Sequence, residues 1–372
     1  MSSVTLNDIY KRYGKVEAVR GISMEISNGE FVAFLGPSGC GKSSTMRMIA
    51  GLEEISAGDI LFDDSSVIDK KPSERNVAMA FETYALYPTL TVYENLAFPL
   101  RAAKWSNFEI DKRVREVAGV MGITELFERK PNRLSSGQSQ SVGLARALIR
   151  NPNVFLLDEP ISHLDTSQRF HMRAYIKRLH IELGYTMIFV THDQEDAMSL
   201  ADRIAVMGTG VLRQIDTPRE IYDHPADVFV AGFIGNPPMN FMDCKFVIEN
   251  GRSLLKRQDV SIEVPFSYLP AIQKGSMPSE VTFGIRPFYI DLKFERSQST
   301  PIPAEIFVVE PLGDMTVVTV VPSDGIRFQV VVPPSFKGQP KQNIWLGLDP
   351  NHILLFDKQT EKALPRTSHR KL

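Results

Sequence analysis

The run GPSGCGKS, from Gly36 to Ser43, has residue types and spacing suited to binding phosphate. It fits the pattern G-x-x-x-x-G-K-[ST] and stands between an apolar run and a helical stretch. Glycines let backbone N–H groups surround phosphate oxygens, and the N-terminus of the following helix adds positive potential. Lys42 would reach the β and γ phosphates, and the Ser43 hydroxyl would bind Mg²⁺. The residues predicted to contact a nucleotide here are Gly36, Pro37, Ser38, Gly39, Cys40, Gly41, Lys42, Ser43 and Ser44.

Two carboxylates, Asp158 and Glu159, follow the apolar run VFLL. Because parallel strands open toward a ligand at their carboxyl ends, both side chains are expected near the phosphates. Asp158 would hold Mg²⁺ through a water, and Glu159 would polarise the attacking water as a general base. The alternative is a pair of solvated acids at a strand that Pro160 ends. The phosphate loop upstream favours the catalytic interpretation.

A third polar segment, LSSGQ, lies before the helical stretch VGLARALIR. Ser135 and Gln138 are three residues apart, which is the spacing of a capping box at a helix N-terminus. Taken alone, this pattern predicts the start of an ordinary helix.

The elements that would position these residues belong to an α/β core. Short strands are predicted for VTLNDIYKRYG, GISMEIS and EFVAFLG, with a helix after the third. VFLLD and TMIFVTH are continuous apolar runs, which are typical of parallel strands buried on both faces, and QRFHMRAYIKRLHIELG would be the crossover helix. Helical spacing also marks residues 109–122 and 142–150.

The chain of 372 residues is too long for one ordinary core, so two domains are expected. Gly, Asn and Pro in AGFIGNPPMNF mark a linker, and after it short alternating runs such as EIFVVE, TVVTVV and FQVVV predict a mainly β domain. We place an α/β ATPase-type domain at 1–235, with a helical subdomain at about 86–150, and the β domain at 236–372.

The composition describes an ordinary globular protein, with 43% hydrophobic and 23% charged residues. The formal charge of −2 shows that the chain lacks the excess of basic residues that is typical of nucleic-acid-binding proteins. Cys40 and Cys244 are far apart and predict two free thiols in a reducing compartment. No apolar run approaches the roughly 18 to 20 residues of a membrane helix, and the start of the chain lacks the apolar stretch of a secretion signal. These features predict a cytoplasmic location.

Leu134-Ser135-Ser136-Gly137-Gln138, ahead of ARAL and LLDEP, resembles the signature motif of ATP-binding-cassette (ABC) ATPases, usually L-S-G-G-Q. In that family the signature of one subunit closes over the γ-phosphate held by the phosphate loop of a second. The resemblance makes Ser135, Ser136, Gly137 and Gln138 candidate nucleotide contacts and predicts a dimer.

Further residues extend this resemblance over the ATPase domain. Tyr13 stands where the family stacks an aromatic ring on adenine, and His192 resembles the histidine that contacts the γ-phosphate. A lone histidine at a strand end is more often structural, but the accompanying motifs favour the catalytic role. SHLD, which ends at Asp165, resembles the loop that communicates across the dimer.

The second half narrows the resemblance. GNPPMNF, FGIRP, VEPLGD and LGLDPNHILLFD look like the ATPases of carbohydrate importers related to the maltose and glycerol-phosphate systems. The resemblance implies a P-loop ABC ATPase fold followed by a C-terminal all-β, OB-like regulatory domain. It also implies two transmembrane permease subunits as partners, with Tyr84, Ala85 and Leu86 in their docking groove. A periplasmic or extracellular solute-binding protein would act indirectly, and the ATPase would lie at the cytoplasmic face of the inner membrane.

The chain departs from the family pattern near the expected site. Glu82 stands where Gln is usual, so an ionised carboxylate would bind Mg²⁺ but repel phosphate oxygens by up to ~4 kcal/mol at an effective dielectric of about 20. Ser136 replaces a signature glycine, which predicts some crowding of the phosphate. Ser139 and Ser141 replace arginines, so positive charge beside the signature is reduced.

The leading hypothesis is an energy-coupling ATPase that drives uptake of a sugar, sugar derivative or polyol, with ATP and Mg²⁺. The alternative is a weakened regulatory subunit paired with a more active ATPase, and harmless drift explains the altered positions equally well. An ABC protein of DNA repair or translation is disfavoured, because the sequence has one phosphate loop, no long coiled-coil insertion and no basic patch.

Overall fold

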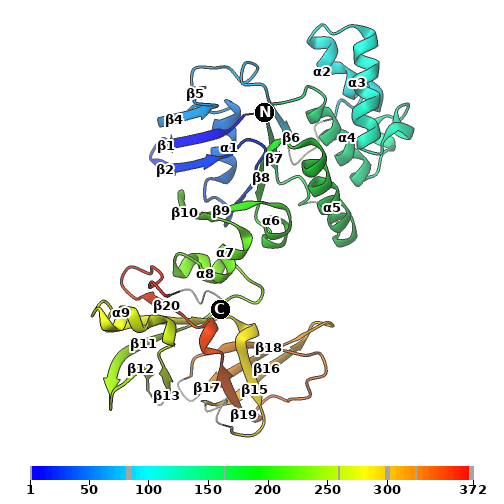
Figure 1. Cartoon of the computed structure of the whole chain (residues 1–372). Coiled ribbons are helices and arrows are strands. Elements are labelled where there is room, and N and C mark those ends of the chain that lie inside the picture. Colours follow the sequence, from blue (N-terminus) through cyan, green and yellow to red (C-terminus); the bar gives the residue numbers. More distant parts are fainter. Residues whose placement is uncertain are drawn as a thin grey trace. The chain divides into compact units, whose positions relative to one another are not determined.

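The computed structural model describes residues 2–80, 86–162, 164–258, 260–297, 302–322 and 325–367 (Figure 1). The chain divides into two compact units, Met1–Pro218 and Arg219–Leu372. No helix in these ranges is long and apolar enough to cross a membrane.

A six-stranded sheet forms the centre of the first unit, with the order β10-β9-β3-β8-β7-β6. Its strands are parallel except β10, which pairs antiparallel with β9. Every residue of β3, β7 and β8 is buried, which explains their continuous apolar sequences and confirms the predicted parallel core. The bounds are β3 (Phe31–Leu35), β6 (Val77–Ala80), β7 (Val154–Asp158), β8 (Thr186–Thr191), β9 (Arg203–Gly208) and β10 (Val211–Asp216).

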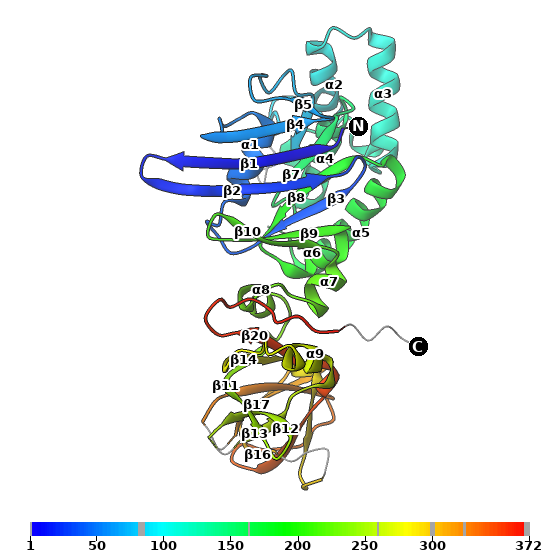
Figure 2. The same ribbon diagram turned by 60° about the vertical axis from the view of Figure 1, so that its left-hand side comes forward.

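An antiparallel sheet with the order β2-β1-β4-β5 forms a second layer. The short strands predicted for VTLNDIYKRYG and GISMEIS are in fact a long hairpin of 10 and 11 residues at one edge of this sheet, seen from the side in Figure 2. Its register shifts at several points, one of them beside Asp8, whose φ is 49°. The bounds are β1 (Val4–Tyr13), β2 (Val16–Ile26), β4 (Ala57–Phe62) and β5 (Ser65–Ser66).

One hydrophobic cluster joins this hairpin to the helix after β3 and to one face of the parallel sheet. Ile9, Met46 and Ile188 represent the three layers, and each is fully buried. The phosphate-loop helix therefore packs between the two sheets. The helices of the first unit are α1 (Lys42–Ala50), α2 (Val92–Ala102), α3 (Asn107–Val120), α4 (Ser136–Leu148), α5 (Thr166–Leu183) and α6 (Gln194–Leu200).

Capping boxes set the N-termini of α2, α3 and α4, with Thr91, Ser106 and Ser135 as the capping residues. The predicted helix at 109–122 is α3. The stretch predicted from residue 142 starts six residues earlier, because the first turns of α4 are polar and show no apolar spacing. Helices occupy most of the region 86–150, together with short 3₁₀ turns at Thr124–Leu126 and Pro131–Arg133.

The second unit is mainly β, as its alternating sequence predicts. Two antiparallel sheets, β13-β12-β11-β14-β20 and β15-β19-β16-β17-β18, share one core that includes Phe283 and Val318. Its helices are α7 (Pro218–Asp223), α8 (Val228–Phe233) and α9 (Leu269–Gln273). Its strands are β11 (Asn240–Glu249), β12 (Arg252–Arg257), β13 (Val260–Glu263), β14 (Glu280–Ile285), β15 (Ile290–Lys293), β16 (Ile302–Pro311), β17 (Thr316–Pro322), β18 (Phe328–Val332), β19 (Asn343–Leu348) and β20 (Leu354–Asp357).

Candidate nucleotide site

The loop between β3 and α1 contains two glycines, Gly36 and Gly41, where a Cβ would clash with neighbouring backbone. A Cβ on Gly36 would lie 2.2 Å from the Met207 carbonyl oxygen. A Cβ on Gly41 would lie 2.6 Å from the Ala18 carbonyl oxygen, and Gly41 also has a φ of 100°. The loop therefore passes close to neighbouring backbone, which requires glycine at both positions.

Lys42 is the first residue of α1 and is only 5% exposed. Its ammonium group donates to the carbonyl oxygens of Gly36, at 2.8 Å, and Pro37, at 3.0 Å. These bonds hold the cation inside the loop at the N-terminus of α1, where anions are favoured. The buried Cys40 thiol lies 3.8 Å away, and burial raises its pKa although Lys42 opposes that shift.

The structure brings together two of the predicted magnesium ligands. The Ser43 hydroxyl donates to a carboxylate oxygen of Asp158 at 3.1 Å, although 114 other residues separate them in sequence. Asp158 is the last residue of β7 and is 8% exposed. Hydroxyl and carboxylate oxygens are the hard ligands that Mg²⁺ prefers, so this pair fits the ion when phosphate oxygens are added.

Glu159 and His192 also meet, with 3.1 Å between Glu159 Oε2 and His192 Nδ1. They follow the neighbouring parallel strands β7 and β8, whose carboxyl ends lie at the same edge. Glu159 has a φ of 46°, and its N–H donates to the Val190 carbonyl at 3.0 Å while its carbonyl accepts from Ser162 Oγ at 2.9 Å. The two side chains remain accessible, at 27% and 50% exposure, as groups that act on a ligand must be.

Arg169, which the sequence analysis missed, connects the two loops that carry this pair. Its Nε donates to the Ile161 carbonyl at 3.2 Å, in the loop after Glu159. Its Nη1 donates to Asp193 at 2.8 Å, directly after His192. The residue lies on α5 at a position with no sequence signal, because only the fold brings these loops together.

Tyr13 lies beside the phosphate-loop helix. Its hydroxyl is 3.4 Å from Ser44 Oγ and hydrogen bonds Glu53, while 45% of the residue stays exposed. Burial of the hydroxyl and the Glu53 contact raise the pKa of this phenol. Lys11 lies 5.0 Å from the ring centroid. The exposed ring area is available for stacking on a base.

The signature residues belong to a different element from the phosphate loop. Ser135 caps α4, accepting from the Gln138 N–H at 3.3 Å, while its own N–H donates to Gln138 at 3.0 Å. Ser136 starts the helix without a positive φ, so the serine fits this backbone. A Cβ on Gly137 would meet nothing within 4 Å. Figure 1 shows α1 and α4 as separate elements, and α1 packs on β6, β7 and β8.

Of the remaining predicted site residues, the structure describes Asp165 but not Glu82. Asp165 caps α5 by accepting from the Gln168 N–H at 2.8 Å. Glu82 lies outside the described residues, as do Tyr84 and Ala85 of the predicted docking groove.

Comparison with known proteins accounts for both units. The ABC transporter family matches residues 19–162, the MalK OB fold domain matches 235–287 and the TOBE domain matches 283–356. The trehalose/maltose import ATP-binding protein of Thermococcus litoralis is 45% identical, over 98% of this chain and 100% of its own length. The sulfoquinovosyl glycerol transport ATP-binding protein of Agrobacterium fabrum is 42% identical, over 98% of this chain and 100% of its own length. A solved ATP-binding cassette, bound to ADP and Pi in a dimeric post-hydrolysis state, is 31% identical with a TM-score of 0.52 over 58% of this chain and 99% of its own.

The chain therefore belongs to the ATP-binding subunits of ABC transporters. Its OB and TOBE domains, together with the relatives above, place it in the carbohydrate-importer branch of that family, and it is an ABC-type ATPase. The family and fold predicted from the sequence are confirmed.

Proposed function

We propose that this protein hydrolyses ATP with Mg²⁺ beneath two permease subunits and drives uptake of a sugar, sugar derivative or polyol such as glycerol. The observation that carries the proposal is the convergence of Ser43 with Asp158 and of Glu159 with His192 on the edge beside the phosphate loop. The relatives support the substrate class, since their names include trehalose, maltose and sulfoquinovosyl glycerol.

The residues of the first unit divide the chemistry among them. Lys42 would hold the β and γ phosphates, and Ser43 and Asp158 would hold Mg²⁺, which supplies charge neutralisation for the phosphates when bound. Glu159 would accept a proton from the attacking water, and His192, 3.1 Å away, would contact the γ-phosphate and orient the carboxylate. Tyr13 would stack on adenine, and the Ser135–Gln138 turn would close the site of a second ATPase subunit.

The proposed location is the cytoplasmic face of the inner membrane, with a solute-binding protein contributing indirectly from the other side. Substrate identity would be set by that protein and by the permeases. Deleting this gene and measuring uptake of labelled maltose, trehalose and glycerol tests the substrate class. Uptake of every compound at the parental rate would contradict the proposal.

Variants of Glu159 test the chemistry directly. Glu159→Gln should still bind ATP but hydrolyse it roughly 10²–10⁴ times more slowly, the usual range for loss of a general base. Lys42→Ala should lose ATP binding, and EDTA should abolish turnover of the unaltered protein. Glu128→Gln, at an exposed acid of the helical region, is the matched control. Hydrolysis at the starting rate in Glu159→Gln would remove this residue from the role.

The alternative of a weakened regulatory subunit finds no support in the comparisons. It predicts slow turnover even when the permeases are present. The same assay on the reconstituted transporter therefore separates the two functions.

A further inference from the structure

The second unit contains a cavity of about 280 Å³ that plays no part in the proposed ATP chemistry. Its walls come from α7, the turn before β15, the turn before β20 and the C-terminal segment. The charged and titratable residues of its lining are Arg219, Asp223, His224, Arg286, His352 and Arg366. Three guanidinium groups therefore share one space with one carboxylate.

Arg286 provides a buried positive charge in this lining. It is 3% exposed, and its Nε and Nη2 donate to the Tyr222 carbonyl at 3.2 and 2.6 Å. Nη1 donates to the Ile234 carbonyl at 2.5 Å, and the guanidinium lies 3.7 Å from the Tyr222 ring centroid. These partners are all neutral, so within the described ranges no carboxylate pairs directly with this cation. A buried charge with neutral partners favours a nearby anion.

Arg366 adds a second, partly buried cation from the C-terminal segment. Its Nη2 donates to the Asp223 carbonyl at 2.8 Å and lies 2.8 Å from His224 Nδ1. The segment itself is held by backbone bonds, such as Leu364 N–H to the Leu355 carbonyl at 2.8 Å. Arg366 is thus held in place before any ligand binds, which reduces the side-chain conformational entropy that is lost on binding.

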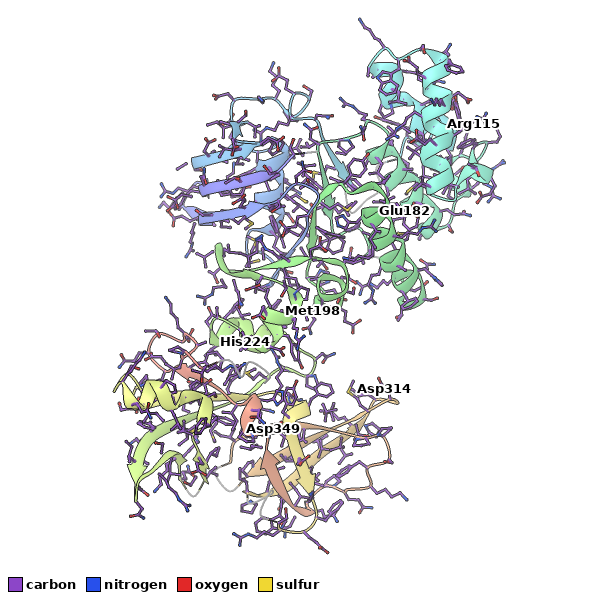
Figure 3. All side chains as sticks on the ribbon, in the orientation of Figure 1. Arg115, Glu182, Met198, His224, Asp314 and Asp349 are labelled. Carbon is purple, nitrogen blue, oxygen red and sulfur yellow. The ribbon has the colours of Figure 1, made fainter. Side chains whose placement is uncertain are left out.

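The remaining groups are Arg219 and a stacked pair of rings, His352 and Tyr289. Arg219 lies 3.4 Å from Asp223, and its side chain is 87% exposed, so it can move toward a ligand. His352 stacks on Tyr289 with ring centroids 3.5 Å apart, and Asp349 holds its Nδ1 at 2.8 Å. Figure 3 labels His224, just after α7, and Asp349, the partner of His352.

We propose that this cavity binds a small phosphate-bearing anion, either inorganic phosphate or a short phosphate monoester. Guanidinium groups match phosphate oxygens in geometry and charge better than they match other common anions. The volume lies just below the roughly 300–1,000 Å³ of pockets for drug-sized ligands, which suits a compact molecule. The site goes beyond the proposed transport function and would give the second unit a small-molecule ligand of its own.

Calorimetric titration of the full-length protein with inorganic phosphate and with glycerol 3-phosphate tests this site. The titrations use a Lys42→Ala background, so that phosphate binding at the ATP site does not contribute. One saturable site should remain in that background. Arg366→Gln and Arg219→Gln should each weaken it about tenfold or more, the loss expected for one charge-assisted hydrogen bond.

Arg252→Gln is the matched control, because Arg252 is an exposed arginine of the same unit outside the cavity, and it should bind as before. Thermal melting of each variant verifies folding, and Arg219→Gln keeps the test informative if loss of Arg366 unfolds the C-terminal segment. Tighter binding of glycerol 3-phosphate would show that the cavity prefers a phosphate monoester. Tighter binding of inorganic phosphate would show that it prefers the free ion. The proposal is overturned by loss of all binding with Lys42→Ala, or by equal affinity in the Arg366, Arg219 and Arg252 variants.

Discussion

At the residue scale, the proposed general base Glu159 lies on a strained turn after a buried strand. Glu159 has a left-handed backbone conformation, which costs a non-glycine residue on the order of 1 kcal/mol. Its backbone bonds to Val190 and Ser162 hold this turn, and its carboxylate reaches His192. This backbone strain occurs at the residue whose carboxylate, the predicted general base, points toward His192.

Arg169 is expected to position this pair without touching the nucleotide. A planar guanidinium can reach the Ile161 carbonyl and Asp193 together, which a lysine ammonium cannot reproduce. Arg169→Gln should lower kcat roughly 10- to 100-fold, because small misplacements of catalytic groups are costly, while KM for ATP changes little. Arg169→Lys should recover only part of the rate.

Steady-state ATPase kinetics at matched folding, verified by thermal melting, measure this effect. Arg178→Gln is the control, since it removes an exposed arginine from the same helix. If Arg169→Gln hydrolysed ATP as fast as the Arg178 variant, Arg169 would have no positioning role.

Asp196 makes stability depend on pH. Burial, with Asp193 nearby, raises the pKa of its carboxyl from 3.8 to about 6, although Arg173 Nε lies 3.4 Å away. Because the folded state favours the protonated form, the contribution of this group is full below pH 4 and is lost as pH rises through about 6. The loss amounts to at most about 3 kcal/mol, from roughly two pKa units at 1.36 kcal/mol each.

Asp196→Asn should therefore raise the melting temperature more at pH 8 than at pH 5, relative to the unaltered protein. Melting curves between these pH values measure the difference. Glu195→Gln, which removes a charge from the adjacent exposed position, should show no such trend. A pH-independent effect of Asp196→Asn would show that this carboxyl does not titrate as expected.

At the element scale, the docking groove expected at Tyr84, Ala85 and Leu86 directly precedes Tyr87 and α2 in the chain. Tyr87 and Phe98 are 41% and 45% exposed, and their ring centroids lie 4.9 Å apart. Asn95, fully buried in α2, accepts from the Tyr87 N–H at 2.8 Å and so fixes the loop on the helix. An apolar surface held in place in this way suits an inserted helix of a partner.

Leu86→Asp should disrupt transporter assembly, because a buried apolar anchor often contributes about 2 kcal/mol or more to an interface. Co-purification with the permeases and uptake by whole cells measure the effect, while the ATPase rate of the isolated chain should persist. Ile181→Asp, at an exposed apolar position of α5, is the control. Intact assembly and transport in Leu86→Asp would place the groove elsewhere.

At the scale of the whole molecule, the signature turn begins α4 and the phosphate loop precedes α1, so the two motifs belong to different elements, as in a site that a second subunit completes. We predict a heterodimer with two unequal ATP sites. Ser136, Ser139 and Ser141 would weaken the site on the partner's loop, and Glu82 would perturb the site on this chain's loop. In a homodimer both sets of changes would act at both sites.

Purification of the transporter from the native cell, followed by mass analysis of the ATPase pair, tests this arrangement. Two different ATPase chains are expected. Two copies of this chain, hydrolysing ATP at rates usual for importers, would rule out the heterodimer.

The local features of this protein were readable from its sequence because they depend on neighbours in the chain. The phosphate loop needs its own glycines, the buried strands need continuous apolar runs, and Ser135 with Gln138 forms a capping box within one turn. The resemblance to ABC importers added the roles of Tyr13 and His192, which spacing alone did not supply.

Contacts between distant segments required the folded chain, because they depend on strand order and loop direction. Parallel pairing of β7 with β8 places Glu159 beside His192, and the adjacent phosphate loop brings Ser43 to Asp158. The Arg169 connection had no sequence signal for the same reason, and FGIRP, which contains Arg286, marked only the family resemblance and not a cavity shared with Arg219 and Arg366. Their side chains come from separate elements, and only tertiary packing decides which charges share a space.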